Sequence, residues 1–375
     1  MLIGQATSRG TNGYALRMGS ATTEKSFRVW RGLRLATVGI GTYAGGPSDD
    51  ALYAEALATA LTEGVNVVDT ARSYRGGASE RVVGEVFARL VGAKVVCRNE
   101  AFVVSKVGFL PDLPVGGAGE RLIALRRQFV SRGLFAWGDL VDGCHCIAPT
   151  YIRYEMERSR QALQLATIDA YLIHNPERQL SAASRSVVTE RMRCAFETLE
   201  QACADGGIGC YGVATWDGLR YRDPDDSRAL SLEVLVGLAQ QVGGSAHHFG
   251  IVQVPYNASL VEAYTQRGQL LLGAQTSALR AAQELGLYVL AAASLNRGRA
   301  GIEGGSPGFP PELRTPAQRA LQFARGTPGV GTALVGMRQI GHVVENMQVL
   351  KCAPPTASAI ATVFASNGWD DAESR

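Results

Sequence analysis

The chain has 375 residues, of which 46% are hydrophobic and 19% charged, with a formal net charge of +3. This composition is typical of a globular protein with a large core. The small net charge and the scattered Lys and Arg residues argue against a nucleic-acid partner. No apolar run is long enough to span a bilayer, so no membrane partner is expected either.

The cysteines predict a reducing compartment. There are seven, an odd number, and they lack the spacing of a disulfide framework. Most lie within apolar runs such as AKVVCRNE and IGCYGVAT, which is typical of reduced, buried thiols. The first stretch, MLIGQATSRGTNGYALRMGSATTEK, lacks the basic region and apolar core of a signal peptide. We therefore expect a cytoplasmic protein.

The predicted elements begin after an N-terminal tail, residues 1–26, which we expect to be flexible. FRVWRGLRLATVG then reads as two short runs around a Gly-containing turn, and predicts a β-hairpin that closes one end of the fold. Further along, apolar runs rich in β-formers predict strands at 35–42, 65–70, 101–107, 168–174, 209–215, 250–256, 287–293 and 331–336. Segments of helical period between them predict helices at 50–63, 79–91, 150–165, 189–205, 228–242, 275–285, 316–325 and 340–350.

The strands lack clean alternation of apolar and polar residues, as expected when protein covers both faces of a parallel sheet. Eight strand–helix repeats predict an α/β protein with a (β/α)₈ TIM barrel as a single domain over 27–352. Residues 353–375 are expected to form a C-terminal helix and tail. A doubly wound open sheet is the alternative, but GIGTYAGGPSDD after the first strand lacks its glycine-rich fingerprint.

The stretch from Gly108 to Pro149 is too long for a plain connection between the third strand and its helix. On a barrel, this loop would lie at the carboxyl ends of the strands, where loops shape active sites. It contains DGCHCIAP. Adjacent Cys-His-Cys residues cannot easily surround one tetrahedral ion, so we expect packing within the loop and no metal. The pair in HHF at 247–249 precedes a strand and is likewise expected to be structural.

Four polar side chains are expected at the carboxyl ends of adjacent strands: Asp69, Tyr74, Lys106 and His174. Taken singly, each has a structural explanation, such as a helix cap or a solvated lysine. Together they can perform chemistry. A carboxylate holds the lysine, the ammonium lowers the pKa of the phenol, and the imidazole orients a substrate oxygen. Such a set can give a proton to an oxygen whose carbon receives a hydride, without a metal.

GVNVVDTARSY, VVSK, IDAYLIHNPE, YGVATW, VQVPYN and ALVGMRQIGHVVENM resemble, in order and spacing, the signatures of the aldo-keto reductases from about residue 30 to 350. GCHCIAP is similar to a string in the long loop of a bacterial subgroup. The resemblance implies a catalytic tetrad of Asp69, Tyr74, Lys106 and His174. It also implies reversible, NADPH- or NADH-dependent reduction of an aldehyde or ketone, on a barrel that binds its cofactor without a Rossmann domain.

The same resemblance implies cofactor contacts. Gln253 and Thr215 match residues that hold the nicotinamide amide. The family's stacking tyrosine after the seventh strand is replaced here by Ala292, so Trp216 or Tyr256 is expected to supply a platform. The remaining expected contacts are Ser294, Leu295, Asn296 and Arg297 for the pyrophosphate, and Gly336, Arg338, Glu345 and Asn346 for the adenosine phosphate. Arg338 is expected at the 2′-phosphate, which favours NADP(H) over NAD(H).

Several functions fit this reading. The leading one is reduction of a small-molecule carbonyl, such as a bulky natural-product ketone or a keto-sugar, in a pocket that includes Tyr43, Trp137 and Trp216, the long loop, the GIEGGSPGFPPE loop and the C-terminal tail. An alternative is NAD(P)-dependent oxidation of a sugar lactol or a secondary alcohol. A cofactor-sensing binding protein is a third, although the complete tetrad gives it no support. A monomer and a small homo-oligomer both fit.

Overall fold

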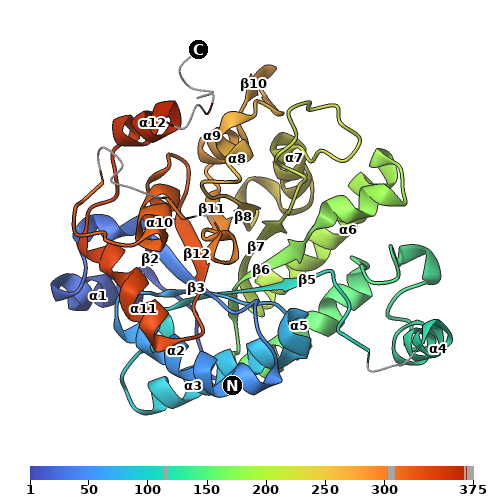
Figure 1. Cartoon of the computed structure of the whole chain (residues 1–375). Helices are drawn as coiled ribbons and strands as arrows, with labels where there is room; N and C mark the ends of the chain where they lie inside the picture. Colours follow the sequence, from blue (N-terminus) through green and yellow to red (C-terminus); the bar gives the residue numbers. More distant parts are fainter. Residues whose placement is uncertain (114–116, 300, 303–308, 367–368, 370–375) are drawn as a thin grey trace.

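The computed structural model describes residues 1–113, 117–299, 301–302, 309–366 and 369. Eight parallel strands close into a barrel (Figure 1) in the order β11-β12-β3-β4-β5-β6-β7-β8. They are β3 (Val38–Gly41), β4 (Val67–Asp69), β5 (Phe102–Val107), β6 (Ile168–His174), β7 (Ile208–Ala214), β8 (Phe249–Pro255), β11 (Tyr288–Ala292) and β12 (Thr332–Gly336). The predicted TIM barrel is therefore confirmed.

Helices cover the outside of the barrel between successive strands (Figure 1). They are α2 (Asp50–Thr62), α3 (Ala78–Gly92), α5 (Pro149–Leu163), α6 (Arg185–Ala204), α7 (Leu232–Gly243), α9 (Ala278–Glu284), α10 (Pro316–Gly326) and α11 (Ile340–Met347). Each lies where a helical period was predicted. After β8, a short helix α8 (Glu262–Thr265) and a hairpin of β9 (Gln269–Leu271) and β10 (Ala274–Thr276) precede α9.

The predicted hairpin consists of β1 (Phe27–Trp30) and β2 (Leu33–Ala36), paired antiparallel. The first predicted strand, 35–42, is thus divided: its start belongs to β2 and only Val38–Gly41 joins the barrel. Trp30 packs against the barrel interior, with its ring centroid 6.4 Å from that of Phe102 and 5.7 Å from that of Tyr288. The hairpin therefore closes the amino-terminal end of the barrel and leaves the opposite end for the site.

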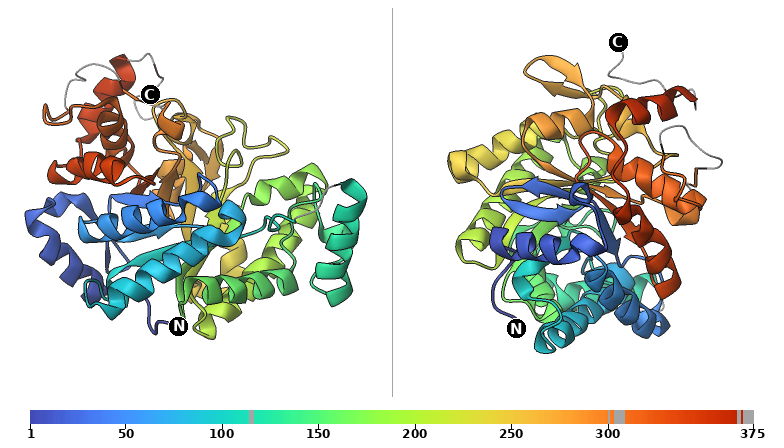
Figure 2. Two further views of the ribbon diagram at one scale, coloured as in Figure 1. Left: turned by 60° about the horizontal axis from the view of Figure 1, so that its bottom comes forward. Right: turned by 90° about the vertical axis from the view of Figure 1, so that its left-hand side faces the viewer.

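The expectation of a flexible tail over 1–26 is wrong. This segment contains helix α1 (Ser8–Arg17), capped by Thr7, and α1 lies beside the hairpin (Figure 2, dark blue). Tyr14 is fully buried, with its hydroxyl 2.8 Å from the carbonyl oxygen of Leu61. Arg17 donates two hydrogen bonds to the Glu100 carboxylate, at 2.6 and 2.8 Å. A buried ring and a bidentate ion pair attach the segment to the barrel, which composition alone could not reveal.

The long segment after β5 carries helix α4 (Ala118–Gln128), which projects from the side of the barrel (Figure 1). The two ends of this long segment are joined by backbone hydrogen bonds. Leu110 N donates to Cys144 O at 2.8 Å, and Cys146 N donates to Gly108 O at 2.8 Å. At the other end of the chain, α12 (Ala357–Ser366) packs on α10, with the Phe364 and Phe323 rings 5.7 Å apart. None of the helices within the described residues has both the length and the apolar character needed to cross a membrane.

Candidate active site

The four predicted catalytic residues meet at one rim of the barrel. Asp69 ends β4, Lys106 lies near the end of β5 and His174 ends β6. Tyr74 begins a 3-10 turn shortly after β4. The carboxyl ends of neighbouring parallel strands lie at the same edge, so side chains far apart in sequence are brought together.

A buried ion pair forms the centre of the site. Lys106 Nζ donates to Asp69 Oδ1 at 2.6 Å and to Thr70 O at 2.8 Å. Both side chains are buried, and burial raises the pKa of Asp69 and lowers the pKa of Lys106. The attraction between the two charges opposes both shifts. The short contact therefore holds a cation in the barrel mouth that would otherwise lose its proton more readily.

Tyr74 lies beside this pair, with Lys106 Nζ 4.9 Å from the centre of its ring. Its ring centroid is 5.8 Å from that of His174 and 5.0 Å from that of Tyr43. The expected direction of its pKa shift is wrong, because burial raises the pKa of Tyr74 well above its ordinary value. The phenol therefore carries its proton at neutral pH, as a proton donor must.

His174 is a neutral imidazole. Burial, and then the nearby Lys106 charge, lower its pKa well below the ordinary value. A neutral ring has one donor and one acceptor nitrogen, so it can hydrogen-bond a substrate oxygen without itself supplying a charge.

Three of the expected cofactor residues present buried polar atoms that have no partner within the described part of the chain: Gln253 Oε1, Thr215 Oγ1 and Asn346 Oδ1. Thr215 follows β7 and Gln253 lies in β8, and the Thr215 N–H donates to Gln253 O at 2.8 Å. Buried polar groups in folded proteins almost always have a hydrogen-bond partner. The hydrogen-bonding capacity of these three atoms is therefore unused within this part of the chain.

The loop after β11 has an unusual backbone. Ala293, Asn296 and Arg297 have φ values of 55°, 43° and 56°, in the left-handed region that non-glycine residues rarely adopt. Ser294 is buried and its hydroxyl donates to Ala291 O at 3.0 Å, while Leu295 is partly buried against the core. The exposed Arg297 guanidinium lies 5.7 Å from the centre of the Tyr43 ring. Such strain is concentrated at functional sites, and this loop extends over the same mouth as Tyr43.

Tyr256 is not the aromatic platform that the sequence predicted. It is fully buried, stacked on Phe323 at 5.7 Å, and its hydroxyl lies 3.0 Å from Thr327 Oγ1. This expectation is wrong because the chain after Pro255 turns the ring outward, into the layer between barrel and helices. Trp216 keeps an exposed side chain, and its backbone N–H donates to Glu177 Oε1 at 2.6 Å.

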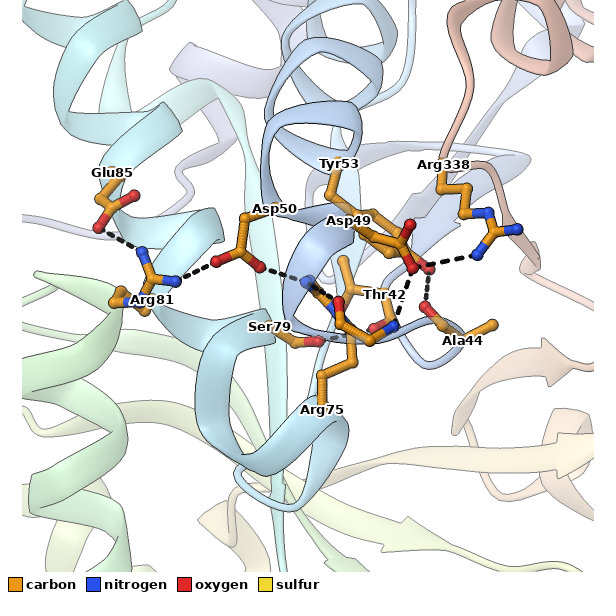
Figure 3. Close-up of polar contacts among 11 residues, drawn as sticks. Thr42, Ala44, Asp49, Asp50, Tyr53, Arg75, Ser79, Arg81, Glu85 and Arg338 are labelled. Carbon is orange, nitrogen blue, oxygen red and sulfur yellow. Dashed lines mark hydrogen bonds and ion pairs between the residues drawn. The ribbon is translucent and has the colours of Figure 1, made fainter.

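The segment after β12 carries the residues expected at the adenosine phosphate. Gly336 ends β12 with its backbone exposed, and Arg338 Nη1 donates to Asp49 Oδ2 at 3.1 Å (Figure 3). The Glu345 carboxylate accepts a hydrogen bond from Thr315 Oγ1 at 2.6 Å, so it connects α11 to α10. Arg338 is thus half-exposed but already paired, which the sequence did not indicate.

A second arginine that the sequence reading missed fastens the loop of the catalytic tyrosine. Arg75 follows Tyr74 in a left-handed conformation, with φ of 53°, and its side chain is fully buried. It donates to Gly46 O at 2.7 Å, forms an ion pair with Asp50 and lies 4.8 Å from the centre of the Tyr53 ring (Figure 3). The only sign of this role in the local sequence was an arginine directly after the tyrosine. The partners of Arg75 lie before α2 or within α2.

The predicted substrate-pocket aromatics are exposed: Tyr43 by 57%, Trp137 by 44% and Trp216 by 48%. Tyr43 contacts Tyr74 directly, whereas Trp137 lies in a 3-10 turn of the long loop, Trp137–Asp139. Within the described residues, no ring contact joins Trp137 to the other two. Part of the GIEGGSPGFPPE loop, 303–308, lies outside the described residues, as does most of the tail beyond 366.

The GCHC string lies against the site. His145 is fully buried, with Nε2 2.7 Å from the backbone oxygen of His174. The Phe109 ring contacts both imidazoles, with its centroid 5.2 Å from that of His145 and 5.0 Å from that of His174. The described residues contain no group of three His, Cys, Asp or Glu side chains arranged to hold a metal ion. In HHF, His248 pairs with Glu200 at 2.7 Å just before β8, at the amino-terminal end of the barrel.

The comparisons with known proteins agree with this architecture. The model of the aldo/keto reductase family matches residues 37–223, about half of the chain. Among curated proteins, an aldose reductase of Encephalitozoon cuniculi is 30% identical over 114 residues, which cover 30% of this chain and 36% of that protein. The chain thus matches only about a third of the length of this relative.

Two solved structures share the fold over nearly their whole length. An aldo/keto reductase from Klebsiella pneumoniae, in complex with NADP and acetate, is 21% identical with a TM-score of 0.57, and the match covers 92% of this chain and 95% of that one. The glycerol dehydrogenase from Gluconobacter oxydans is 20% identical with a TM-score of 0.60, covering 92% and 96%. With its barrel and its family-model match, the chain belongs to the aldo/keto reductase family.

Proposed function

We propose that this protein is an NAD(P)H-dependent oxidoreductase that reduces an aldehyde or a ketone to the alcohol. The observation that carries the proposal is the buried Lys106–Asp69 pair beside a protonated Tyr74 and a neutral His174. A metal-free reduction needs a proton donor, a nearby cation and a hydrogen-bonding group at the substrate oxygen, and these four residues supply them.

Each residue has a distinct task in this proposal. Tyr74 gives its proton to the substrate oxygen, and the Lys106 ammonium stabilises the phenolate that remains. Asp69 keeps Lys106 charged and in place through the 2.6 Å contact. His174 orients the substrate carbonyl by a hydrogen bond to its oxygen. The hydride that the carbonyl carbon receives would come from a reduced nicotinamide held by the residues described next.

The chain's own residues fit such a cofactor. The orphaned Gln253 and Thr215 oxygens suit a carboxamide, and Asn346 Oδ1 suits an adenine amino group. Backbone N–H groups of Ser294, Leu295 and Asn296, with the Arg297 guanidinium, suit a pyrophosphate. Further contacts at the adenosine end come from Gly336 and Glu345. Arg338 can bind a 2′-phosphate through guanidinium nitrogens other than Nη1, which favours NADP(H).

One observation favours a second candidate function. Because Asp49 already pairs with Arg338, the 2′-phosphate would meet a carboxylate as well as a guanidinium. This favours the alternative reading, in which NAD(H) is used and a sugar lactol or secondary alcohol is oxidised. The substrate of either reaction is a small molecule, and the exposed Tyr43, Trp137 and Trp216 suit a bulky carbonyl such as a natural-product ketone or a keto-sugar.

The first test is fluorescence titration of the protein with NADPH and NADH, followed by turnover of an aromatic aldehyde such as 4-nitrobenzaldehyde. Tyr74→Phe should retain nucleotide binding and lose about a hundredfold or more of turnover, the usual contribution of a positioned proton donor. Tyr256→Phe removes a buried hydroxyl outside the barrel mouth and is the matched control. Binding of neither nucleotide, or full turnover by Tyr74→Phe, would contradict the proposal.

A further inference from the structure

The long loop after β5 inserts one buried imidazole behind the candidate site. Both ring nitrogens of His145 have partners. Nδ1 is 2.8 Å from Gln179 Nε2, and Nε2 is 2.7 Å from the backbone oxygen of His174. Gln179 is also fully buried, in the 3-10 turn Pro176–Ser181 that follows His174. Loop, turn and strand end are therefore joined through one ring.

The direction of these hydrogen bonds is fixed by an arginine on α6. Arg191 Nη1 donates to Gln179 Oε1 at 2.5 Å. A guanidinium can only donate, so the carboxamide oxygen faces Arg191 and its NH₂ group faces His145. His145 Nδ1 must then accept, and the ring proton lies on Nε2, where it donates to His174 O. The hydrogen bonds run from Arg191 through Gln179 and His145 to the peptide of His174.

The His145 bond replaces a missing strand contact. The β5–β6 ladder ends with Val107 opposite Ile173, one residue before His174. Beyond it, Gly108 turns away with φ of 143°, and a Cβ at Gly108 would lie 2.7 Å from His174 O and 2.8 Å from His145 Nε2. The carbonyl of His174 has therefore left the ladder with β5, and a side chain supplies its donor.

The environment keeps His145 neutral. Burial lowers its pKa from 6.5 to about 4 and outweighs the opposing effect of the hydrogen bond to His174 O. The Arg178 cation also lowers this pKa, and the Asp142 carboxylate opposes it. A neutral ring is what the hydrogen-bond directions require. The lowered pKa thus agrees with a neutral ring, and the hydrogen-bond directions select its tautomer.

We propose that His145 is a positioning residue for His174: its Nε2–H bond to the His174 peptide fixes where the His174 imidazole points in the barrel mouth. The long loop, through His145, thereby sets the geometry of the reaction. The role of His174 toward a substrate rests on the proposed function, but the tautomer and the hydrogen-bond direction do not.

The direct test is side-chain ¹⁵N NMR of the full chain labelled at histidine. His145 should show a neutral ring protonated at Nε2, unchanged between about pH 5 and pH 8 because the ring protonates only below this range. A ring protonated at Nδ1, or an imidazolium at neutral pH, would overturn the proposal. This measurement needs no turnover, so it is independent of whether the proposed activity is found.

The functional test compares His145→Phe with His248→Phe, a control that removes a hydrogen-bonded histidine at the other end of the barrel. His145→Phe keeps a ring against Phe109 but loses both hydrogen bonds. Turnover should fall about tenfold or more, because even a small misplacement of a catalytic group slows the reaction. Nucleotide affinity should stay unchanged, and the His174 resonances should move. Unchanged turnover with unmoved His174 resonances would contradict the proposal.

Gln179→Glu keeps the shape of the side chain and tests the same point if His145→Phe does not fold. A carboxylate at this position can only accept from Nδ1, so it raises the pKa of His145 and favours the doubly protonated ring. The charged groups facing this ring are then the introduced carboxylate, Arg191, Arg178, Asp142 and, across the strand end, Lys106 near His174. When the ring of this variant becomes neutral, the carboxylate keeps the remaining proton on Nδ1, and Nε2 can no longer donate to His174 O. Turnover should therefore acquire a new pH dependence, falling as His145 loses its second proton, whereas an unaltered pH profile would overturn the positioning role.

Discussion

Arg338 and Asp49 join the loops that follow two neighbouring strands of the barrel, β12 and β3. Arg338 Nη1 donates to Asp49 Oδ2 at 3.1 Å, and the same carboxylate oxygen accepts from Gly46 N at 2.8 Å (Figure 3). The Gly46 N–H, followed by the Arg338 charge, lowers the pKa of Asp49. A Cβ at Gly45 would lie 2.3 Å from this oxygen, so the turn itself makes room for it. The carboxylate is ionised and anchored, and cannot simply swing away from the guanidinium.

Asp49→Asn should therefore change cofactor preference. A negative charge close to the expected 2′-phosphate position repels it and shares the guanidinium with it. We expect affinity for NADPH to rise about tenfold and affinity for NADH to stay within about twofold, measured by fluorescence titration at fixed salt.

Two variants control this measurement. Asp50→Asn removes the neighbouring carboxylate, which pairs with Arg75 and Arg81 instead of Arg338, and should leave the preference unchanged. In Arg338→Met the gain in NADPH affinity from Asp49→Asn should be smaller, because only the repulsion between carboxylate and phosphate is then removed. Weaker NADPH binding by Asp49→Asn in the presence of Arg338 would mean that Asp49 orients the arginine and does not compete for it.

Lys106→Met should destabilise the fold as well as abolish turnover. It leaves the Asp69 carboxylate buried without its cation, which costs about 3–5 kcal/mol in the free energy of unfolding. Adding Asp69→Asn to Lys106→Met removes the isolated charge and should recover part of this loss. Urea denaturation of the two single variants and the double variant measures this recovery. A double variant less stable than Lys106→Met would contradict the ion pair between Lys106 and Asp69.

Substitutions of Tyr14 should lower the free energy of unfolding, because the N-terminal segment packs on the folded domain. Tyr14→Phe removes the hydroxyl that contacts Leu61 O and should cost about 1 kcal/mol. Tyr14→Ala empties a fully buried ring site and should cost about 3–5 kcal/mol, as large-to-small core substitutions do. Thermal and urea unfolding report both losses. Equal stability of wild type and Tyr14→Ala would restore the flexible-tail expectation.

Burial of His145 should make the protein less stable in mild acid. The folded-state pKa of about 4 lies below the unfolded value of 6.5. Between these pH values the unfolded chain binds a proton at His145 that the folded ring does not bind. The free energy of unfolding therefore falls as pH decreases from about 7 to about 4, and below about pH 4 His145 adds no further change. The shift corresponds to about 3 kcal/mol, taking 1.36 kcal/mol for each pKa unit.

The contribution of His145 can be separated from the carboxylates by difference. Urea unfolding at pH 7 and pH 5 should show a smaller loss for His145→Phe than for wild type, although the variant is less stable at pH 7. Equal losses in the two proteins would show that His145 binds protons equally in the folded and unfolded states.

The sequence alone determined the barrel and its rim. Strand periods, helix periods and their order depend on residues near one another, and the parallel topology then places Asp69, Lys106 and His174 at one edge. Tyr74 follows Asp69 closely enough to share that edge. These assignments need no knowledge of long-range contacts, because the repeat itself sets which ends meet.

The tertiary structure decided everything that depends on burial and on distant partners. The pKa of Tyr74 rises because of burial and, after it, the nearby Asp69 and Tyr43, which no local pattern reveals. Tyr14 and Tyr256 are buried by elements far away in the chain, so a tail was expected at one and an open platform at the other. The partners of Arg338 and His145 likewise come from other loops. Residue types can be read along a chain, but desolvation and the direction of a hydrogen bond exist only once the chain has closed around them.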